Sequence, residues 1–137
     1  MIRLTQTPLE AKRGEWRYMS LNGPLSKKSK DFSIRLYKYY KWLTKEQHEY
    51  KLSDQLLRSG TSIGANVCEA IYAVSHADFV SKMHIAAKEA HETEYWLEVL
   101  SGVDLLPNEF ADLKDNCCEL SKMLTAALKT AKEKSEK

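Results

Sequence analysis

Apolar residues recur at alternating intervals of four and three along three stretches of the chain, and this spacing strongly constrains the fold. Side chains spaced in this way share one face of an α-helix. The three series are Phe32, Leu36, Tyr39 and Leu43; Phe79, Met83, Ala86, Ala90, Thr93, Leu97 and Leu100; and Phe110, Leu113, Cys117, Leu120, Leu124, Ala127 and Ala131. The pattern predicts amphipathic helices, and no strand is needed to explain it.

A fourth helix is expected between the first two series, where the apolar positions are Leu56, Ile63, Val67, Ala70 and Val74. Ser53 is expected to cap its start, and Ser75 with Asp78 three residues later forms a capping box for the next helix. Gly102 is expected to end that helix in the left-handed conformation. These signals predict helices at about residues 27–45, 53–74, 76–101 and 108–134.

Short connections between four helices predict an all-α, antiparallel, up-and-down four-helix bundle with neighbours packed about 20° from parallel. A length of 137 residues suits one domain. We expect the bundle to occupy residues 25–137 and an irregular arm to occupy residues 1–24, where Trp16 and Tyr18 lie among basic residues.

Charge is divided unevenly along the chain. Residues 1–51 carry 12 Lys/Arg and 5 Asp/Glu, residues 52–128 carry 5 and 12, and residues 129–137 carry 4 and 2. The division suits a basic surface that meets an anionic partner, and it equally suits a basic first helix packed beside acidic helices. No apolar stretch is long enough to cross a membrane and no secretory signal is recognisable, so we expect a cytoplasmic protein without a membrane partner.

A stripe of polar residues follows one edge of the second expected helix. Its members are Gln55, Arg58, Ser59, Ser62, Asn66 and Glu69. Gly60 and Gly64 lie in the same helix, where each costs about 1 kcal/mol relative to alanine, which predicts that another backbone passes close to them.

Facing positions on the second and third helices should sum to about 150, because the chain turns near residues 75–76. Arg58 then faces Glu92, Ser62 lies near Lys88 or Glu89, and Glu69 lies near Lys82. The favoured interpretation is a polar network that sets register within or between subunits; a ligand pocket and a solvated edge are the alternatives.

Catalytic and metal-binding signatures are not recognisable. Di-metal bundles use Glu-x-x-His motifs, and none occurs in the sequence. His84 and His91 could share a helix face, but such a pair is more typical of a surface or core. The glycines of the second helix lack the lysine of a phosphate-binding loop. We therefore expect a protein that is not an enzyme and that holds no cofactor.

The first helix combines basic and aromatic residues. Lysines can contact phosphates and aromatic rings can stack on bases, so this helix is the candidate nucleic-acid surface. The candidate contacts are Lys27, Lys28, Arg35, Lys38, Lys41 and Lys45. Aromatic residues at helical spacing are more often part of a core or a subunit interface, and lysines opposite them often form a solvated face.

The run QLLRSGTSIGANVCEA at residues 55–70 resembles the signature of bacterial four-helix-bundle proteins encoded in intervening sequences of 23S ribosomal RNA genes. Phe79, Lys82, the AKEA-x-E run from Ala87 and the YWL run from Tyr95 extend the resemblance over about residues 31–128. Ser59 stands where this family usually has alanine.

The resemblance implies an antiparallel four-helix bundle that assembles into a homopentamer, without established catalysis and with a suspected association with RNA or DNA. The chain is also similar to the pentameric accessory proteins of diversity-generating retroelements, which bind a reverse transcriptase and nucleic acid. In a pentamer, Arg58, Asn66 and Glu69 would help to fix subunit register. The alternative function is a scaffold or accessory subunit that binds a protein partner and makes no direct contact with nucleic acid.

Overall fold

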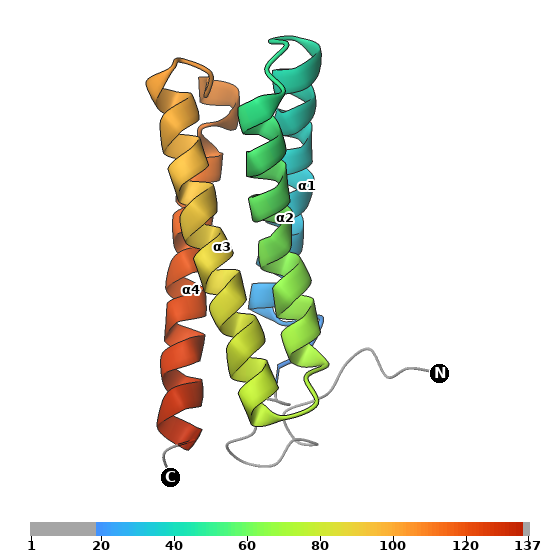
Figure 1. Ribbon diagram of the computed structural model, residues 1–137, viewed down its shortest axis with the longest axis vertical. Helices are drawn as coiled ribbons and strands as arrows, with labels where there is room; N and C mark the ends of the chain where they lie inside the picture. The colour runs from blue at the N-terminus through green and yellow to red at the C-terminus, as the bar shows by residue number, and fades with distance from the viewer. Residues whose placement is uncertain (1–18, 136–137) are drawn as a thin grey trace, which may run out of the picture.

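The structure, a computed structural model, describes residues 19–135, and every regular element within this range is helical. The elements are α1 (Pro24–Lys45), α2 (Lys51–Ile71), α3 (His76–Gly102), the short 3-10 helix η2 (Asn108–Phe110) and α4 (Asp112–Ser135). The four long helices lie side by side and alternate in direction, as Figure 1 shows. The predicted all-α four-helix fold is therefore confirmed. The expected arm lies mostly outside the described residues.

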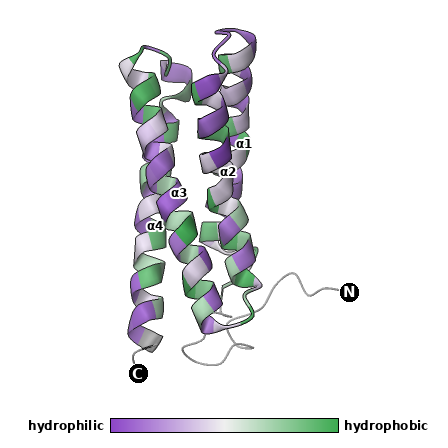
Figure 2. Cartoon of the chain, in the orientation of Figure 1, coloured by the Kyte–Doolittle hydropathy of each residue, from purple (hydrophilic) through white to green (hydrophobic). Residues whose placement is uncertain are grey.

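The core is formed by the apolar faces that the spacing predicts. All members of the first two series are buried, and so are those of the third except Ala127, which is partly exposed beside the buried Leu128. Figure 2 shows hydrophobic and hydrophilic residues alternating along each helix, as amphipathic packing requires. Among the described residues, no helix is long and apolar enough to span a membrane.

Helix α2 is capped by a residue other than the expected one. It begins at Lys51, and the Glu49 carboxylate accepts hydrogen bonds from the backbone N–H groups of Leu52 and Ser53 at 2.8 and 2.7 Å. Ser53 lies inside the helix, where its buried hydroxyl donates to the Glu49 carbonyl at 2.8 Å. The assignment of Ser53 as the cap was wrong because a longer carboxylate side chain reaches the same N–H groups.

Ser75 caps α3 as predicted, but the reciprocal bond of the predicted capping box goes to the residue before Ser75. The Ser75 hydroxyl accepts from the Asp78 N–H at 3.0 Å, and the Asp78 carboxylate accepts from the Val74 N–H at 3.1 Å. Helix α2 nevertheless ends at Ile71, three residues before the expected position, so Val74 lies outside it and is 87 % exposed.

Three other predicted ends also need correction. Helix α1 begins at Pro24, whose missing N–H costs nothing in the first turn. At the end of α3, the left-handed residue is Asp104 with φ of 61°, and Gly102 is still helical. Residues Asn108–Phe110 form a 3-10 turn before α4, which therefore begins at Asp112.

Both glycines of α2 face α1 closely, but only one of them meets a backbone. A Cβ added at Gly64 would lie 3.4 Å from the Ser29 carbonyl oxygen and hydroxyl, so the expected close backbone approach is confirmed there. A Cβ added at Gly60 would overlap the Leu36 side chain. Gly60 therefore makes room for a core side chain.

An aromatic cluster joins α1 to the connection between α3 and α4. The ring centroid of Tyr39 lies 6.1 Å from that of Trp42 and 5.1 Å from that of Phe110. The Tyr39 hydroxyl donates to the Leu105 carbonyl at 2.6 Å, and burial raises the pKa of this phenol far above its usual value. The phenol therefore stays protonated and holds the end of the bundle closed.

Candidate nucleic-acid interface

The face of α1 that points away from the core carries a continuous row of lysines. The row and its apolar neighbours are Lys27, Lys30, Ile34, Tyr37, Lys38, Lys41 and Lys45. Ile34 and Tyr37 are each 50 % exposed, and the Lys41 ammonium lies 5.9 Å from the centroid of the Tyr37 ring. The other lysines of the row are exposed, and none of them forms an ion pair with a described residue; they are Lys27, Lys30, Lys38 and Lys45. Their charges are therefore available to an anionic ligand.

Lys28 and Arg35 lie on a different side of α1 from this row. The Lys28 ammonium is 2.7 Å from the Glu119 carboxylate, and the Arg35 guanidinium is 3.0 Å from the Asp112 carboxylate. Arg35 also donates to the Glu109 carbonyl. The hydrogen bond to Arg35 lowers the pKa of Asp112 and raises that of Arg35. These two candidate contacts are thus matched by acids at α4.

The aromatic residues of α1 divide between the core and the surface. Phe32 and Tyr39 are buried, so neither ring can stack on a base. Tyr37 is half exposed and stacks on Tyr40, with ring centroids 6.1 Å apart. The Tyr40 hydroxyl donates to the Asp54 carboxylate, and this bond raises the pKa of Tyr40. Tyr37 is the aromatic side chain that the lysine row presents to solvent.

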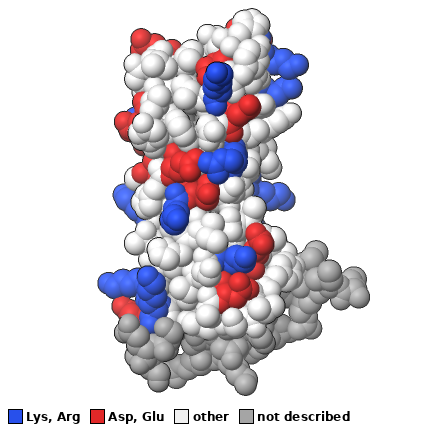
Figure 3. Space-filling view, in the orientation of Figure 1, with Lys and Arg blue, Asp and Glu red and all other residues white. Residues whose placement is uncertain are grey.

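The space-filling view separates the two kinds of charged surface. In Figure 3, Lys and Arg on the face formed by α2 and α3 lie against Asp and Glu, whereas basic groups project without acidic neighbours at the upper right edge. Figure 1 places α1 along that edge. The arrangement combines both interpretations of the uneven charge: part of the basic helix pairs with α4, and the remainder faces solvent.

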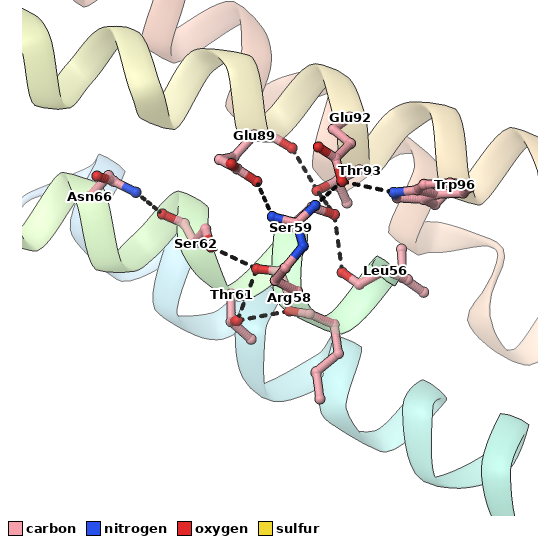
Figure 4. Close-up of polar contacts among 11 residues, drawn as sticks. Leu56, Arg58, Ser59, Thr61, Ser62, Asn66, Glu89, Glu92, Thr93 and Trp96 are labelled. Carbon is pink, nitrogen blue, oxygen red and sulfur yellow. Dashed lines mark hydrogen bonds and ion pairs between the residues drawn. The ribbon is translucent and has the colours of Figure 1, made fainter. Parts of the chain in front are cut away.

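Arg58 is the centre of the polar contacts between α2 and α3, drawn in Figure 4. Its guanidinium donates to the Glu92 carboxylate, as the summed positions predict, and to Glu89 at 3.4 Å. Glu92 also accepts from the Trp96 indole N–H at 3.0 Å. Nearer the other end of α2, the Lys82 ammonium lies 3.8 Å from the Glu69 carboxylate. These interactions lie within one chain.

Ser62 and Asn66 bond to their own helix rather than to α3. The Ser62 hydroxyl donates to the Arg58 carbonyl at 2.7 Å, and the Asn66 amide donates to the Ser62 carbonyl at 2.8 Å. Gln55 is exposed and forms no hydrogen bond within the described part of the chain. The expected approach of Ser62 to Lys88 or Glu89 does not appear among the described hydrogen bonds.

A buried pair of hydroxyls lies behind the Arg58 contacts. The Ser59 and Thr93 hydroxyl oxygens are 2.9 Å apart, and Thr93 also lies within 2.7 Å of the Glu89 carbonyl. Both residues are fully buried. The sequence placed Thr93 in an apolar series and Ser59 in the polar stripe, so the pair was not predicted. The signal that could have found it is the sum of the two positions, 152, which is close to the value of about 150 expected for facing residues.

The described residues offer no constellation typical of a metal centre. No group of three or more His, Cys, Asp or Glu side chains within residues 19–133 is placed to hold an ion. The polar contacts between α2 and α3 are ion pairs and hydrogen bonds that join the two helices.

Comparison with known proteins agrees with the fold and the residue pattern. The family model for the 23S rRNA-intervening sequence protein matches residues 24–126. No curated protein matches the chain. A similar solved structure is a protein of unknown function from the S23 ribosomal protein family of Bacteroides thetaiotaomicron, with 45 % identity and a TM-score of 0.74 over 77 % of this chain and 95 % of that one. The chain belongs to the 23S rRNA-intervening sequence protein family.

Proposed function

We propose that this protein is a non-enzymatic homo-oligomer, a pentamer, that binds RNA or DNA through the lysine row of α1. The observation that carries the proposal is a helix face with five lysines, none of them ion-paired to a described residue, around the exposed Ile34 and Tyr37. Lysine rows bind phosphates, and an exposed ring among them favours unpaired bases on which it can stack. Single-stranded nucleic acid is therefore the favoured ligand.

Assembly would multiply this surface. Five copies of α1 held in one particle would contact a single strand at several points, so the apparent affinity would exceed that of one subunit. Within such an assembly, the half-buried Asn66 of α2 would help to set subunit register, as the resemblance suggests. Light scattering tests the subunit number, because five chains of 15.8 kDa give a particle of about 79 kDa.

Charge reversal on α1 tests the ligand. We expect the triple variant Lys38→Glu, Lys41→Glu, Lys45→Glu to lose most binding to a labelled single-stranded RNA. Its slope of log affinity against log salt should fall by about two, since each phosphate contact contributes about 0.7 on single strands. The measurement is fluorescence anisotropy at several salt concentrations.

A matched control reverses three ion-paired lysines elsewhere. Lys28→Glu, Lys82→Glu and Lys114→Glu change the net charge equally but lie outside the row. We expect this variant to retain the salt slope of the parent protein. Equal losses in the two variants would show that net charge matters and that the α1 surface does not.

The scaffold alternative gives a different result in the same preparation. A scaffold would purify without absorbance from nucleic acid, would not bind the labelled RNA, and would recover one protein in stoichiometric amount from a lysate. Trp16 and Tyr18, the aromatic residues of the expected N-terminal arm, would be candidates for docking a partner protein, and both lie outside the described residues.

A further inference from the structure

A second basic surface lies in a groove between α3 and α4. The groove has a volume of about 450 Å³ and is near the end of the bundle where α3 begins and α4 ends. Its charged and titratable lining residues are His84, Lys88, His91, Lys129, Lys132 and Glu133. Lysine or arginine groups with an acidic group beside them are visible low on the left of Figure 3.

The chemistry of the lining suits phosphate groups. Even without Lys132 and with neutral histidines, Lys88 and Lys129 outnumber the one carboxylate of the lining, Glu133, so the groove is positively charged. Lys88 and Lys129 form no ion pair with any described residue. The groove is open to solvent, and its lining also includes Ala87 and Leu128.

The length of the groove favours a strand over a single phosphate ion. His84 and His91 are seven residues apart on α3, a rise of about 10 Å along the helix axis. Lys88 lies between them, so positive or protonatable groups recur along the channel at nearly every turn. A row of this kind contacts successive phosphates of one strand.

The sign of the charge changes farther along the same seam. The next groove between α3 and α4 contains Glu94, Glu98, Asp115 and Lys114, and the Lys114 ammonium lies 3.1 Å from the Glu98 carboxylate. His91 borders both grooves. The acids end where the basic groove begins, which would limit a bound strand to the first groove.

The charged groups on the far side of α3 are occupied by α2. Arg58 pairs there with Glu89 and Glu92, and Lys82 pairs with Glu69. The charges that face His84 and His91 are therefore Lys88 on α3, the lysines and Glu133 of α4, and the acids of the adjoining groove.

We propose that the groove between α3 and α4 is a second binding site for the phosphate backbone of a nucleic-acid strand. The ligand class rests on the proposed function, whereas the site is separate from the lysine row of α1.

The first experiment uses tripolyphosphate as the probe and does not depend on nucleic-acid binding. Histidine ring proton signals are followed by NMR at about pH 6 while tripolyphosphate is added. We expect saturable shifts at His84 and His91, assigned with the variants His84→Gln and His91→Gln. His48, which is exposed in the α1–α2 connection, is the internal control. Shifts no larger than those of His48 would mean that the groove binds only an adventitious ion and would overturn the proposal.

The second experiment measures binding of labelled single-stranded RNA to the groove variant Lys88→Glu, Lys129→Glu. We expect this variant to bind about two- to tenfold more weakly than the parent protein, since exposed charge contacts are individually weak. The control Lys28→Glu, Lys82→Glu reverses two ion-paired lysines outside the groove and should bind as the parent does. Equal affinities of the groove variant and the control would overturn the proposal.

The α1 triple variant separates the two sites. It should bind RNA more weakly than the parent protein, and adding the two groove substitutions to it should weaken binding further. If the parent protein does not bind RNA, the proposed function fails, and the tripolyphosphate titration alone decides whether the groove is a phosphate site.

Discussion

Alanine at Gly60 and at Gly64 should change stability in opposite directions, although the two glycines lie one turn apart on α2. At Gly60 the new methyl group would overlap a side chain of α1, because the Leu36 Cδ2 atom occupies that space and Leu36 is fully buried. At Gly64 the new methyl group would make ordinary contacts at 3.4 Å with Ser29.

The two substitutions share one favourable term and differ in one unfavourable term. Alanine stabilises a helix interior by about 0.8–1.0 kcal/mol relative to glycine, and this gain applies at both positions. Overpacking a filled core costs about 1–3 kcal/mol, and this cost applies at Gly60 alone. Gly64→Ala should therefore stabilise the fold by about 0.5–1 kcal/mol, and Gly60→Ala should lie about 1–3 kcal/mol below it.

Urea unfolding followed by circular dichroism at 222 nm measures both effects. The protein concentration must be the same for each variant, since any assembly makes the apparent free energy of unfolding depend on concentration. The difference between the two variants isolates the packing term, because the helix propensity gain cancels. A Gly60→Ala variant as stable as Gly64→Ala would refute the close packing of α1 against α2 at Leu36.

Three further predictions concern capping, acid stability and thiol access. Glu49→Ala should lower the free energy of unfolding by about 1 kcal/mol in a urea titration, because its carboxylate caps α2. The ion pair with Arg35 lowers the pKa of Asp112 below its usual value of 3.8. The ion pair therefore stabilises the fold above that pH, and this stabilisation is lost as the pH falls further. In the variant Asp112→Asn, the urea midpoint should decrease less steeply below about pH 4. Burial raises the pKa of Cys117 to about 12, so a thiol reagent should modify the two exposed cysteines of the native protein and reach Cys117 after unfolding in urea.

The sequence predicted the parts of the fold that depend on local spacing and symmetry. The apolar series fixed three core faces, since burial of one face is what a regular helical pattern specifies. The helix cap at Ser75 needs residues only three apart, so it is visible without a structure. The pairing of Arg58 with Glu92 followed from the turn position alone, because antiparallel neighbours count in opposite directions from a short turn.

Features that depend on the arrangement of several helices were not predicted. Lys28 and Arg35 belong to the same basic helix as Lys38, and only the position of α4 shows that their charges are matched by acids. Glu49 replaced Ser53 as the cap because a bent connection brings its carboxylate over the first turn of α2. The groove that contains Lys129 is formed by two helices, so the sequence of α4 alone does not show it.

The hydrogen bond between Tyr39 and Leu105 also has a consequence for synthesis of the chain. Its partners are 66 residues apart, so at about 5–20 residues per second a ribosome needs about 3 to 13 seconds to add the second after the first. Helix α1 can pack against α2 during this interval, but the Tyr39 hydroxyl lacks its acceptor until Leu105 has been synthesised. We therefore expect the seam between α1 and the α3–α4 connection to form after the pairing of α1 with α2.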